Sequence, residues 1–351
     1  PSGPTACVEG CAYKQKYEKI IGDVSVAPWA EEADKRDPVV VIPGIMGSWR
    51  KTQMSELELD PIFGVYDDLI ETLDENGYEE GKDLFRFPYE WRMSNVESAK
   101  LLRTRINAIK AQAKWPKVDI VAHSMGGLVT REYIRALGGD ASIDQFITLG
   151  TPHKGAPKSY LQWEGGEFVG FSGFFAEKIF QQEAEENGYG SIFEYIRSVP
   201  VQSVRELLPV YPYLRNVGES EPMLYASPEY PTNTFLENLG TAAALQKLEK
   251  VSLTNIVGKT ENDATIEEIR TNGLSIELLD DPEKPVLWGH GKPDGYDDLF
   301  GGDRGLELGA GDGTVPLGSA TGIISDESIE LVSSHGDLPS DAAEIVYRTF
   351  T

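Results

Sequence analysis

The sequence predicts an α/β fold, in which helices flank a mostly parallel central sheet. Two observations support this prediction. Short runs of β-branched and apolar residues alternate with segments of helical spacing, which is the pattern of βαβ units. One run, 118–122, is followed by Ser124 and then directly by a helical pattern. A serine on a tight turn between strand and helix is typical of a nucleophile elbow.

The first predicted strand, Val39–Ile42, is a continuous β-branched run, as expected for a strand buried on both faces. Ser94 and Glu97 have the spacing of a capping box, so a helix is predicted to begin there. The apolar residues of that helix recur at helical spacing: Leu101, Leu102, Ile106 and Ile109.

Three further elements surround Ser124. Val118–Ala122 is predicted as a strand, Gly126–Leu137 as the helix behind it and Ile143–Leu149 as the next strand. In parallel sheets the functional site lies at the carboxyl ends of the strands, and Ser124 falls at one of these ends.

Composition limits the classes of partner. The 351 residues suffice for one large α/β domain, and a net charge of −25 makes nucleic acid an unfavourable partner. No apolar run approaches the roughly 18 residues of a membrane span, so at most transient contact with a lipid surface is expected. We expect no cofactor and no metal ion. The charge fits a secreted protein, and a start at Pro1 without methionine fits a processed chain or a fragment.

Residues 1–36 are polar, carry no clear element and are predicted to form an N-terminal extension. The two cysteines of the chain, Cys7 and Cys11, lie within this segment. They form either a small disulfide, which would indicate an oxidising compartment, or two free thiols.

The turn at Ser124 needs small residues two positions before and two positions after the serine, and Ala122 and Gly126 meet this need. Such a turn lifts the serine hydroxyl off the sheet and directs the Met125 N–H toward a developing oxyanion. The segment 43–48 after the first strand contains a proline–glycine turn and a second glycine. It is either an ordinary turn or a second source of oxyanion donors.

A serine nucleophile needs a base, and the chain contains four histidines: His123, His153, His290 and His335. The elbow directs His123 away from the hydroxyl, His153 lies on a bend, and His290 lies in a Gly- and Asp-rich loop that we expect to be solvated. His335 follows the last strand-like run, which matches the Ser…Asp/Glu…His order of α/β-hydrolases.

Two aspartates between Ser124 and His335 are candidates for the acid of a triad. Asp263 closely follows the strand-like run Val251–Val257. Asp312 lies between two glycines, which allow a sharp turn that exposes the carboxylate. That context favours Asp312 as the group that orients His335 and stabilises its imidazolium.

Five motifs occur along the chain in this order: Val41–Ser48, Tyr89–Arg92, Ala122–Gly127, Leu149–Pro152 with Gly155 and Pro157, and Gly311–Pro316. With the strand that leads into the first motif and with His335 they span residues 39 to 335. In this order they resemble the lecithin–cholesterol acyltransferase family, which includes lysosomal phospholipases and phospholipid–diacylglycerol acyltransferases.

The resemblance implies an α/β-hydrolase fold, acyl-ester chemistry and a catalytic triad of Ser124, Asp312 and His335. It also implies an oxyanion hole formed by the backbone N–H groups of Ile45 and Met125.

Several features depart from the family pattern or leave an alternative open. Ala122 stands where glycine is commoner, and Glu90 replaces the more usual aspartate. Both cysteines precede the first strand, so the disulfide-closed lid of the mammalian members is absent or held differently. Met46 is the alternative to Ile45 as the first oxyanion donor, and we expect Arg92 to form an ion pair.

The segment 155–251 interrupts the α/β alternation, and we predict a helical, aromatic-rich cap inserted between core segments 37–154 and 252–351. Fifteen of the 34 Phe, Trp and Tyr residues lie between 155 and 235. They form either a private core of the cap or an acyl-binding wall and lid over Ser124. The predicted substrate-binding residues are Met46, Phe168, Phe171, Phe174 and Phe175.

A second segment that interrupts the alternation, the excursion 271–310, is rich in Asp and Gly. It is a hairpin, a calcium-stabilised loop or a solvated loop, and the composition favours the solvated loop. Its carboxylates do not have the spacing of an EF-hand: Asp294, Asp297, Asp298 and Asp303.

The sequence therefore predicts a serine acyl-ester hydrolase, that is, a lipase, phospholipase or esterase. Transfer of the acyl group to an alcohol instead of water would make it an acyltransferase. Two alternatives remain at this point. One is a non-catalytic lipid-binding or scaffold module of a larger secreted protein. The other is a hydrolase of a thioester, a polyester or a peptide.

Overall fold

The computed structural model describes residues 36–51, 55–169, 171–198, 201–280, 285–297 and 302–351, without the side chains of 113, 171–175 and 279–280. Asp37–Thr351 forms one compact unit. The predicted extension, with Cys7 and Cys11, lies outside the described residues apart from its last residue, and so do Asp298 and the chain around it.

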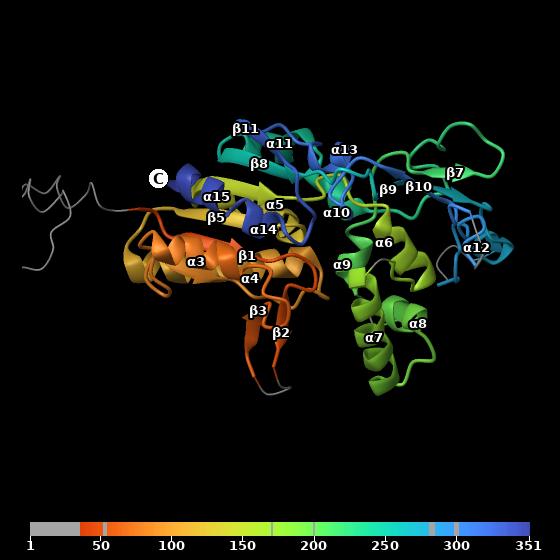
Figure 1. Cartoon of the computed structure of the whole chain (residues 1–351), viewed down its shortest axis with the longest axis horizontal. Helices are drawn as coiled ribbons and strands as arrows, with labels where there is room; N and C mark the ends of the chain where they lie inside the picture. Colours follow the sequence, from red (N-terminus) through yellow and green to blue (C-terminus); the bar gives the residue numbers. More distant parts are fainter. Residues whose placement is uncertain (1–35, 52–54, 170, 199–200, 281–284, 298–301) are drawn as a thin grey trace, which may run out of the picture. The chain divides into compact units, whose positions relative to one another are not determined.

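A six-stranded, all-parallel sheet forms the centre of the described chain, with strand order β11-β8-β6-β5-β1-β4 (Figure 1). Its strands are β1 (Val39–Ile42), β4 (Leu84–Arg86), β5 (Val118–His123), β6 (Ile143–Leu149), β8 (Ser252–Gly258) and β11 (Glu327–Leu331). The register pairs His123 with Leu149 and Leu149 with Ile256, so the carboxyl ends of β5, β6 and β8 lie together. The fold prediction of a parallel sheet is confirmed.

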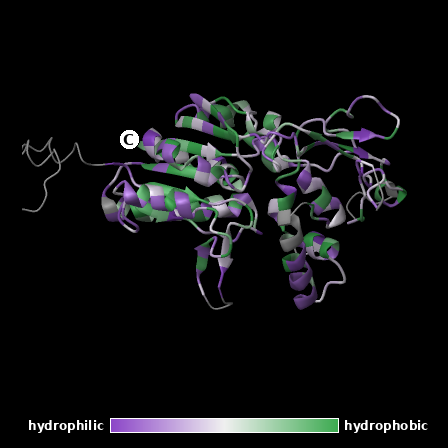
Figure 2. Ribbon diagram, in the orientation of Figure 1, coloured by the Kyte–Doolittle hydropathy of each residue, from purple (hydrophilic) through white to green (hydrophobic). Residues whose placement is uncertain are grey.

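Alternate residues of the central strands pack against helices on opposite faces of the sheet. Val40 and Ile120 belong to a core cluster with Leu102 of α4 (Asn95–Ala113) and Leu128 of α5 (Met125–Leu137). Val39, Val41 and Val121 belong to a second cluster on the other face, with three helices: α3 (Asp67–Glu75), α14 (Leu338–Asp341) and α15 (Ala343–Phe350). Apolar residues accordingly concentrate in the central strands (Figure 2). Both faces are buried, which is why β1 is apolar throughout rather than alternating.

The capping box predicted at the start of α4 forms only in part. Ser94 Oγ accepts a hydrogen bond from the Val96 N–H at 3.2 Å, as an N-cap should. Glu97, however, pairs with Lys100 at 2.5 Å. The carboxylate of Glu206 instead accepts from Ser94 Oγ and from the Asn95 N–H, both at 2.6 Å.

The predicted apolar stripe of α4 also needs one correction, because Leu101 is 50% exposed. Leu102, Ile106 and Ile109 are buried as predicted. A 19-residue helix lying on a sheet buries one stripe only, and Leu101 falls beside that stripe.

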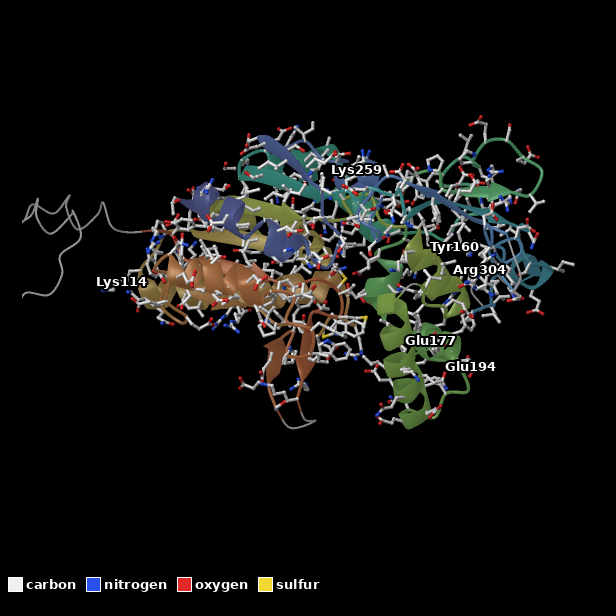
Figure 3. The ribbon with its side chains drawn as sticks, in the orientation of Figure 1. Lys114, Tyr160, Glu177, Glu194, Lys259 and Arg304 are labelled. Atoms are coloured by element: carbon white, nitrogen blue, oxygen red, sulfur yellow. The ribbon has the colours of Figure 1, made fainter. Side chains whose placement is uncertain are left out.

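The segment after β6, which we call the insertion, departs from the α/β alternation. Its elements are α6 (Lys158–Tyr160), a π-helical turn η2 (Leu161–Gly165), α7 (Phe171–Glu186), α8 (Ile192–Ser198), α9 (Gln202–Arg205), β7 (Leu214–Asn216), α10 (Thr234–Leu239) and α11 (Ala242–Leu248). Exposed acidic side chains such as Glu177 and Glu194 lie on α7 and α8 (Figure 3). The last two helices, α10 and α11, contact the core helix α5, so the insertion merges with the core before residue 251.

The insertion is not purely helical, because β7 joins a second sheet. This sheet has the order β10-β9-β7, with β9 (Thr265–Thr271) at its centre and β10 (Leu306–Gly309) antiparallel to it. The excursion 271–310 thus connects two hydrogen-bonded strands. The remaining elements are the antiparallel pair β2 (Ser48–Arg50) and β3 (Leu57–Leu59), η1 (Gly139–Ala141), α12 (Ile276–Asp280) and α13 (Leu317–Ala320). Among the described helices, not one has the length and hydrophobicity that a membrane crossing requires.

Candidate active site

Ser124 occupies a strained turn between β5 and α5. Its φ of 54° and ψ of −126° fall outside the regions that most L-residues adopt. The Ser124 N–H donates to Leu149 O at 2.8 Å, which fixes the turn against β6. A Cβ on Gly126 would lie 2.5 Å from the carbonyl oxygen of Pro43, so only glycine fits at that position. This contact explains the glycine two positions after the serine.

The structure brings Ser124, His335 and Asp312 together in one hydrogen-bonded row. His335 Nε2 lies 2.9 Å from Ser124 Oγ, and His335 Nδ1 lies 2.7 Å from Asp312 Oδ2. The residues come from the end of β5, the loop after β11 and the turn after β10. All three thus lie at the carboxyl edge of the central sheet.

Asp312 is a buried carboxylate in the turn between Gly311 and Pro316. Its Oδ1 accepts the N–H groups of Thr314 at 2.9 Å and Val315 at 2.7 Å. Burial raises the pKa of Asp312, but the charge and hydrogen bond of His335 and these two N–H groups outweigh it and hold that pKa below its ordinary value. The carboxylate therefore stays ionised beside His335.

The other candidate acid, Asp263, does not take part in this row. It is exposed in the turn between β8 and β9, while His335 Nδ1 is bonded to Asp312. In the motif Leu149–Pro152, glycine is required at position 150. A Cβ there would lie 3.0 Å from Asp312 Oδ2 and 3.2 Å from His335 Nδ1.

The segment after β1 forms a tight turn closed by a 3.1 Å hydrogen bond from the Gly47 N–H to Gly44 O. That bond uses the Gly47 N–H, so the Ile45 N–H lies outside it, and Met46, the third residue of the turn, has a φ of 60°. Met125 begins α5, so its N–H has no partner within the helix. In the part of the chain that the structure describes, no backbone hydrogen bond uses the N–H of Ile45 or Met125.

Tyr89, from the Tyr89–Arg92 motif, holds the segment 43–48 against the sheet. Its hydroxyl donates to Pro43 O at 3.0 Å, and its N–H donates to Ser48 Oγ at 3.1 Å. In the same motif, Arg92 stacks over the ring of Trp91 at 4.0 Å and pairs with Glu183 of α7 at 3.0 Å. The expected ion pair of Arg92 thus joins the core to the insertion.

The remaining histidines are not available as a base for Ser124. His123 is buried beneath the elbow, where burial and the neighbouring charge of His335 lower its pKa to about 3. His153 is buried 3.3 Å from Arg131, and burial and that charge hold its pKa well below its ordinary value. His290, which we expected to be solvated, instead lies half-buried with Nδ1 3.1 Å from the buried carboxylate of Glu164.

The predicted substrate-binding residues are described only in part. Met46 is half-buried, and its carbonyl accepts from the Trp49 indole at 2.5 Å. Phe168 is half-buried, with its ring 4.8 Å from that of Phe180, which is 1% exposed. The side chains of Phe171, Phe174 and Phe175 lie outside the described residues. Their role stays a prediction.

The carboxylates of the excursion 271–310 do not gather into an ion site within the described residues. Arg270 pairs with Asp303 at 2.7 Å and with Asp294 at 3.4 Å, while Lys292 pairs with Asp297.

Tyr66 is a site residue that sequence reasoning missed. Its hydroxyl accepts the Gly44 N–H and lies 2.9 Å from His123 Nδ1, directly below the elbow. It precedes α3 in a segment without periodicity, and its partners lie 22 and 57 residues away. No local pattern in the sequence marks such a residue.

The sheet order, the elbow and the row of three side chains define an α/β-hydrolase fold, with Ser124 on the turn between β5 and α5. The family model described as lecithin:cholesterol acyltransferase matches residues 52–263, more than half of the chain. The chain belongs to this family. The matched range includes Ser124 but ends before Asp312 and His335.

Individual relatives match shorter segments. Phospholipase A(1) LCAT3 of Arabidopsis thaliana is 32% identical over 96 residues, which cover 26% of this chain and 22% of that protein. The lysosomal phospholipase A and acyltransferase of Bos taurus is 34% identical over 105 residues, or 28% of this chain and 26% of that protein. The chain thus matches about a quarter of these relatives' length.

Among solved structures, the Bacillus licheniformis lipase BlEst2 in mature form aligns with 91% of this chain and 93% of its own. The TM-score is 0.44 and the sequence identity is 14%. The Tle4–Tli4 complex aligns with 97% of this chain and 78% of its own, with a TM-score of 0.46 and 15% identity.

Proposed function

We propose that the protein is a serine acyl-ester hydrolase that forms an acyl-enzyme on Ser124. The observation that carries this proposal is the hydrogen-bonded row from Ser124 Oγ through His335 to Asp312, with separations of 2.9 and 2.7 Å. Each separation lies within the range that proton transfer requires. The names of the relatives, which include phospholipases and an acyltransferase, support an acyl ester of a lipid as the substrate.

In the proposed mechanism, Ser124 Oγ attacks the ester carbonyl carbon while its proton passes to His335 Nε2. The ionised Asp312 holds the imidazole in the tautomer with Nδ1 protonated and stabilises the imidazolium. The oxyanion accepts hydrogen bonds from the N–H groups of Ile45 and Met125, with Met46 as the alternative to Ile45. The alcohol then leaves with the proton from His335.

Deacylation follows by attack of water, or of a second alcohol, on the acyl-enzyme. His335 removes the proton from the attacking oxygen and returns it to Ser124 Oγ, so the enzyme is regenerated. Water gives a lipase, phospholipase or esterase, and an alcohol gives an acyltransferase. The chemistry needs no cofactor. Met46 and the rings of Phe168, Phe171, Phe174 and Phe175 are proposed to contact the acyl chain.

The proposal includes brief contact with a lipid interface and a secreted location. The net charge of −25 supports a secreted location, and a disulfide between Cys7 and Cys11 would add to that support. Detection of the protein in the culture medium of its source cells, against an intracellular marker, would test the location.

The experiment for the activity combines labelling with turnover. A fluorophosphonate probe should label the wild-type chain at Ser124, and a panel of p-nitrophenyl esters, phospholipid and triglyceride should identify the hydrolysed bond. Ser124→Ala should abolish labelling and leave only the roughly 10³–10⁴-fold acceleration over water that other groups supply. Ser328→Ala, at an exposed position of β11, is the matched control and should retain full activity.

Three outcomes would change the proposal. An unlabelled, inactive wild-type chain that still binds lipid would indicate a non-catalytic module. Activity on thioesters, polyesters or peptides alone would change the substrate class. Turnover of Ser124→Ala within tenfold of wild type would remove Ser124 from the mechanism.

A further inference from the structure

A chain of hydrogen bonds links Gly44, Tyr66, His123 and His335 beside the elbow. The Gly44 N–H donates to the Tyr66 hydroxyl at 2.9 Å, and that hydroxyl lies 2.9 Å from His123 Nδ1. His123 Nε2 lies 3.0 Å from the carbonyl oxygen of His335. Tyr66 and His123 are 3% and 6% exposed, so water does not compete for these bonds.

The position of every proton in this chain follows from its two ends. The Gly44 N–H can only donate, so Tyr66 Oη accepts there and its single proton goes to His123 Nδ1. The His335 carbonyl can only accept, so His123 Nε2 carries the ring proton. The neutral tautomer of His123 with the proton on Nε2 satisfies all three bonds. In a protonated ring, Nδ1 would also carry a proton, and two donors, Nδ1–H and the Tyr66 hydroxyl, would face each other.

The two ends of this chain lie on the two loops that the proposed reaction uses. Gly44 immediately precedes Ile45, a proposed oxyanion donor. The carbonyl of His335 belongs to the proposed base, whose ring lies 4.7 Å from that of His123. Gly44 also approaches the nucleophile so closely that a Cβ there would lie 2.8 Å from Ser124 Cβ. A small shift of either loop would therefore misplace the donor or the base relative to Ser124 Oγ.

We propose that Tyr66 and His123 are positioning residues. They hold the segment 43–48, which carries the proposed oxyanion donor, and the loop of His335 at fixed distances around Ser124. The inference rests on the proposed function and extends it to two residues that do not touch the substrate. A neutral His123 also suits this place, because the adjacent His335 becomes positively charged during acylation.

Burial supports the neutral state of His123. Burial is the largest cause that lowers its pKa, and the charge of His335 acts in the same direction, while the His335 carbonyl and Asp312 oppose them. Burial also raises the pKa of Tyr66, so its hydroxyl keeps the proton that it donates.

The central test is Tyr66→Phe, which keeps the ring and removes both hydrogen bonds of the hydroxyl. Complete loss of an oxyanion donor costs about 10²–10³ in kcat, so a displaced donor should cost about 10- to 100-fold. KM should change less than threefold. Tyr230→Phe is the matched control, because the buried Tyr230 hydroxyl also accepts backbone N–H groups, from Tyr213 and Leu214, and donates to Met223 O. It should leave kcat within twofold.

Variants at His123 provide the second arm. His123→Gln keeps one acceptor and one donor, whereas His123→Leu keeps neither, so kcat should fall further for Leu than for Gln. The double variant Tyr66→Phe with His123→Leu should be little worse than His123→Leu alone, because both changes break one chain. If Tyr66→Phe does not fold, the comparison of Gln with Leu at His123 decides the question.

The outcomes separate this inference from the proposed function. If wild type shows no Ser124-dependent turnover, the proposed function is wrong. If wild type turns over through Ser124 but Tyr66→Phe keeps kcat within twofold, or if Gln and Leu at His123 are equivalent, the positioning role alone is wrong. An equal loss in Tyr230→Phe would mean that the effect reports general stability.

Discussion

At the scale of single residues, Asp312 is a carboxylate that stays charged although it is buried. Its 2% exposure favours the neutral form, but His335 and two backbone N–H groups favour the anion more strongly. The charge of Asp312 is thus already in place to orient His335. An amide at this position would present the wrong hydrogen-bonding groups to His335, so the substitution should lower activity.

Asp312→Asn should therefore lower kcat by about 10⁴-fold through stabilisation of the wrong His335 tautomer. Asp263→Asn, at the exposed alternative acid, should leave kcat unchanged. The measurement is kcat on one p-nitrophenyl ester for both variants, with melting temperatures to confirm folding. An inactive Asp263 variant beside an active Asp312 variant would reverse the assignment.

The residues of the site differ in how visible they are in the sequence. Ser124 stands within a local pattern of small residues, so its turn could be predicted from its neighbours. His335 and Asp312 lie 211 and 23 residues from their partners, but chain order and flanking glycines indicate them. Tyr66 and Glu206 act through contacts with distant backbone N–H groups, and no spacing rule reports such contacts.

At the scale of elements, the amino ends of the central strands carry an acidic cluster opposite the proposed site. Asp37 precedes β1, Asp119 lies in β5 and Asp144 in β6, and their carboxylates lie within 4.8 Å of one another. Burial and the two neighbouring carboxylates raise the pKa of Asp119 from 3.8 to about 7, against the lowering effects of the Gln145 N–H and of Lys117. The folded chain therefore holds this proton more tightly than the unfolded chain does.

The contribution of Asp119 to stability should be fully present below about pH 4 and lost as the pH rises through about 7. Asp119→Asn removes the ionisation, so its free energy of unfolding should exceed that of wild type at pH 8, on the order of 2 kcal/mol. Near pH 4 the two should agree closely. Urea unfolding at both pH values, in the presence of a chelator, measures the difference, and the exposed Asp263→Asn serves as control. Destabilisation of Asp119→Asn at pH 8 would contradict the expected sign.

Helices and strands could be predicted from the sequence where neighbouring residues of the chain are buried together. The bounds of β1 and β6 agree with the sequence prediction: β1 is a continuous apolar run, and the last four residues of β6 are buried. The sheet β10-β9-β7 was not predicted, since β7 and β10 are short and partly exposed and pair with β9 from distant parts of the chain. Pairing of that kind depends on tertiary contacts rather than on local propensity.

At the scale of the whole molecule, one aromatic and ionic junction fastens α7 of the insertion to the core. The ring of Phe180 lies 5.6 Å from that of Trp91, and Glu183 of α7 pairs with Arg92. The buried Phe180 thus packs both within the insertion and against the core. Phe168 is only half-buried beside it, and its contact with an acyl chain stays a prediction.

These two rings allow the two interpretations of the insertion to be separated by kinetics. If Phe168 lines an acyl groove, each buried methylene adds up to about 0.8 kcal/mol, so kcat/KM should rise with ester chain length by up to about fourfold per methylene. Phe168→Ala should flatten that rise with a small loss of stability. Phe180→Ala should lower the melting temperature, because a buried Phe→Ala change costs about 3–5 kcal/mol, and leave the slope intact. A flat profile from acetate to dodecanoate in wild type, with Phe168→Ala changing only the melting temperature, would assign both rings to the packing of the insertion.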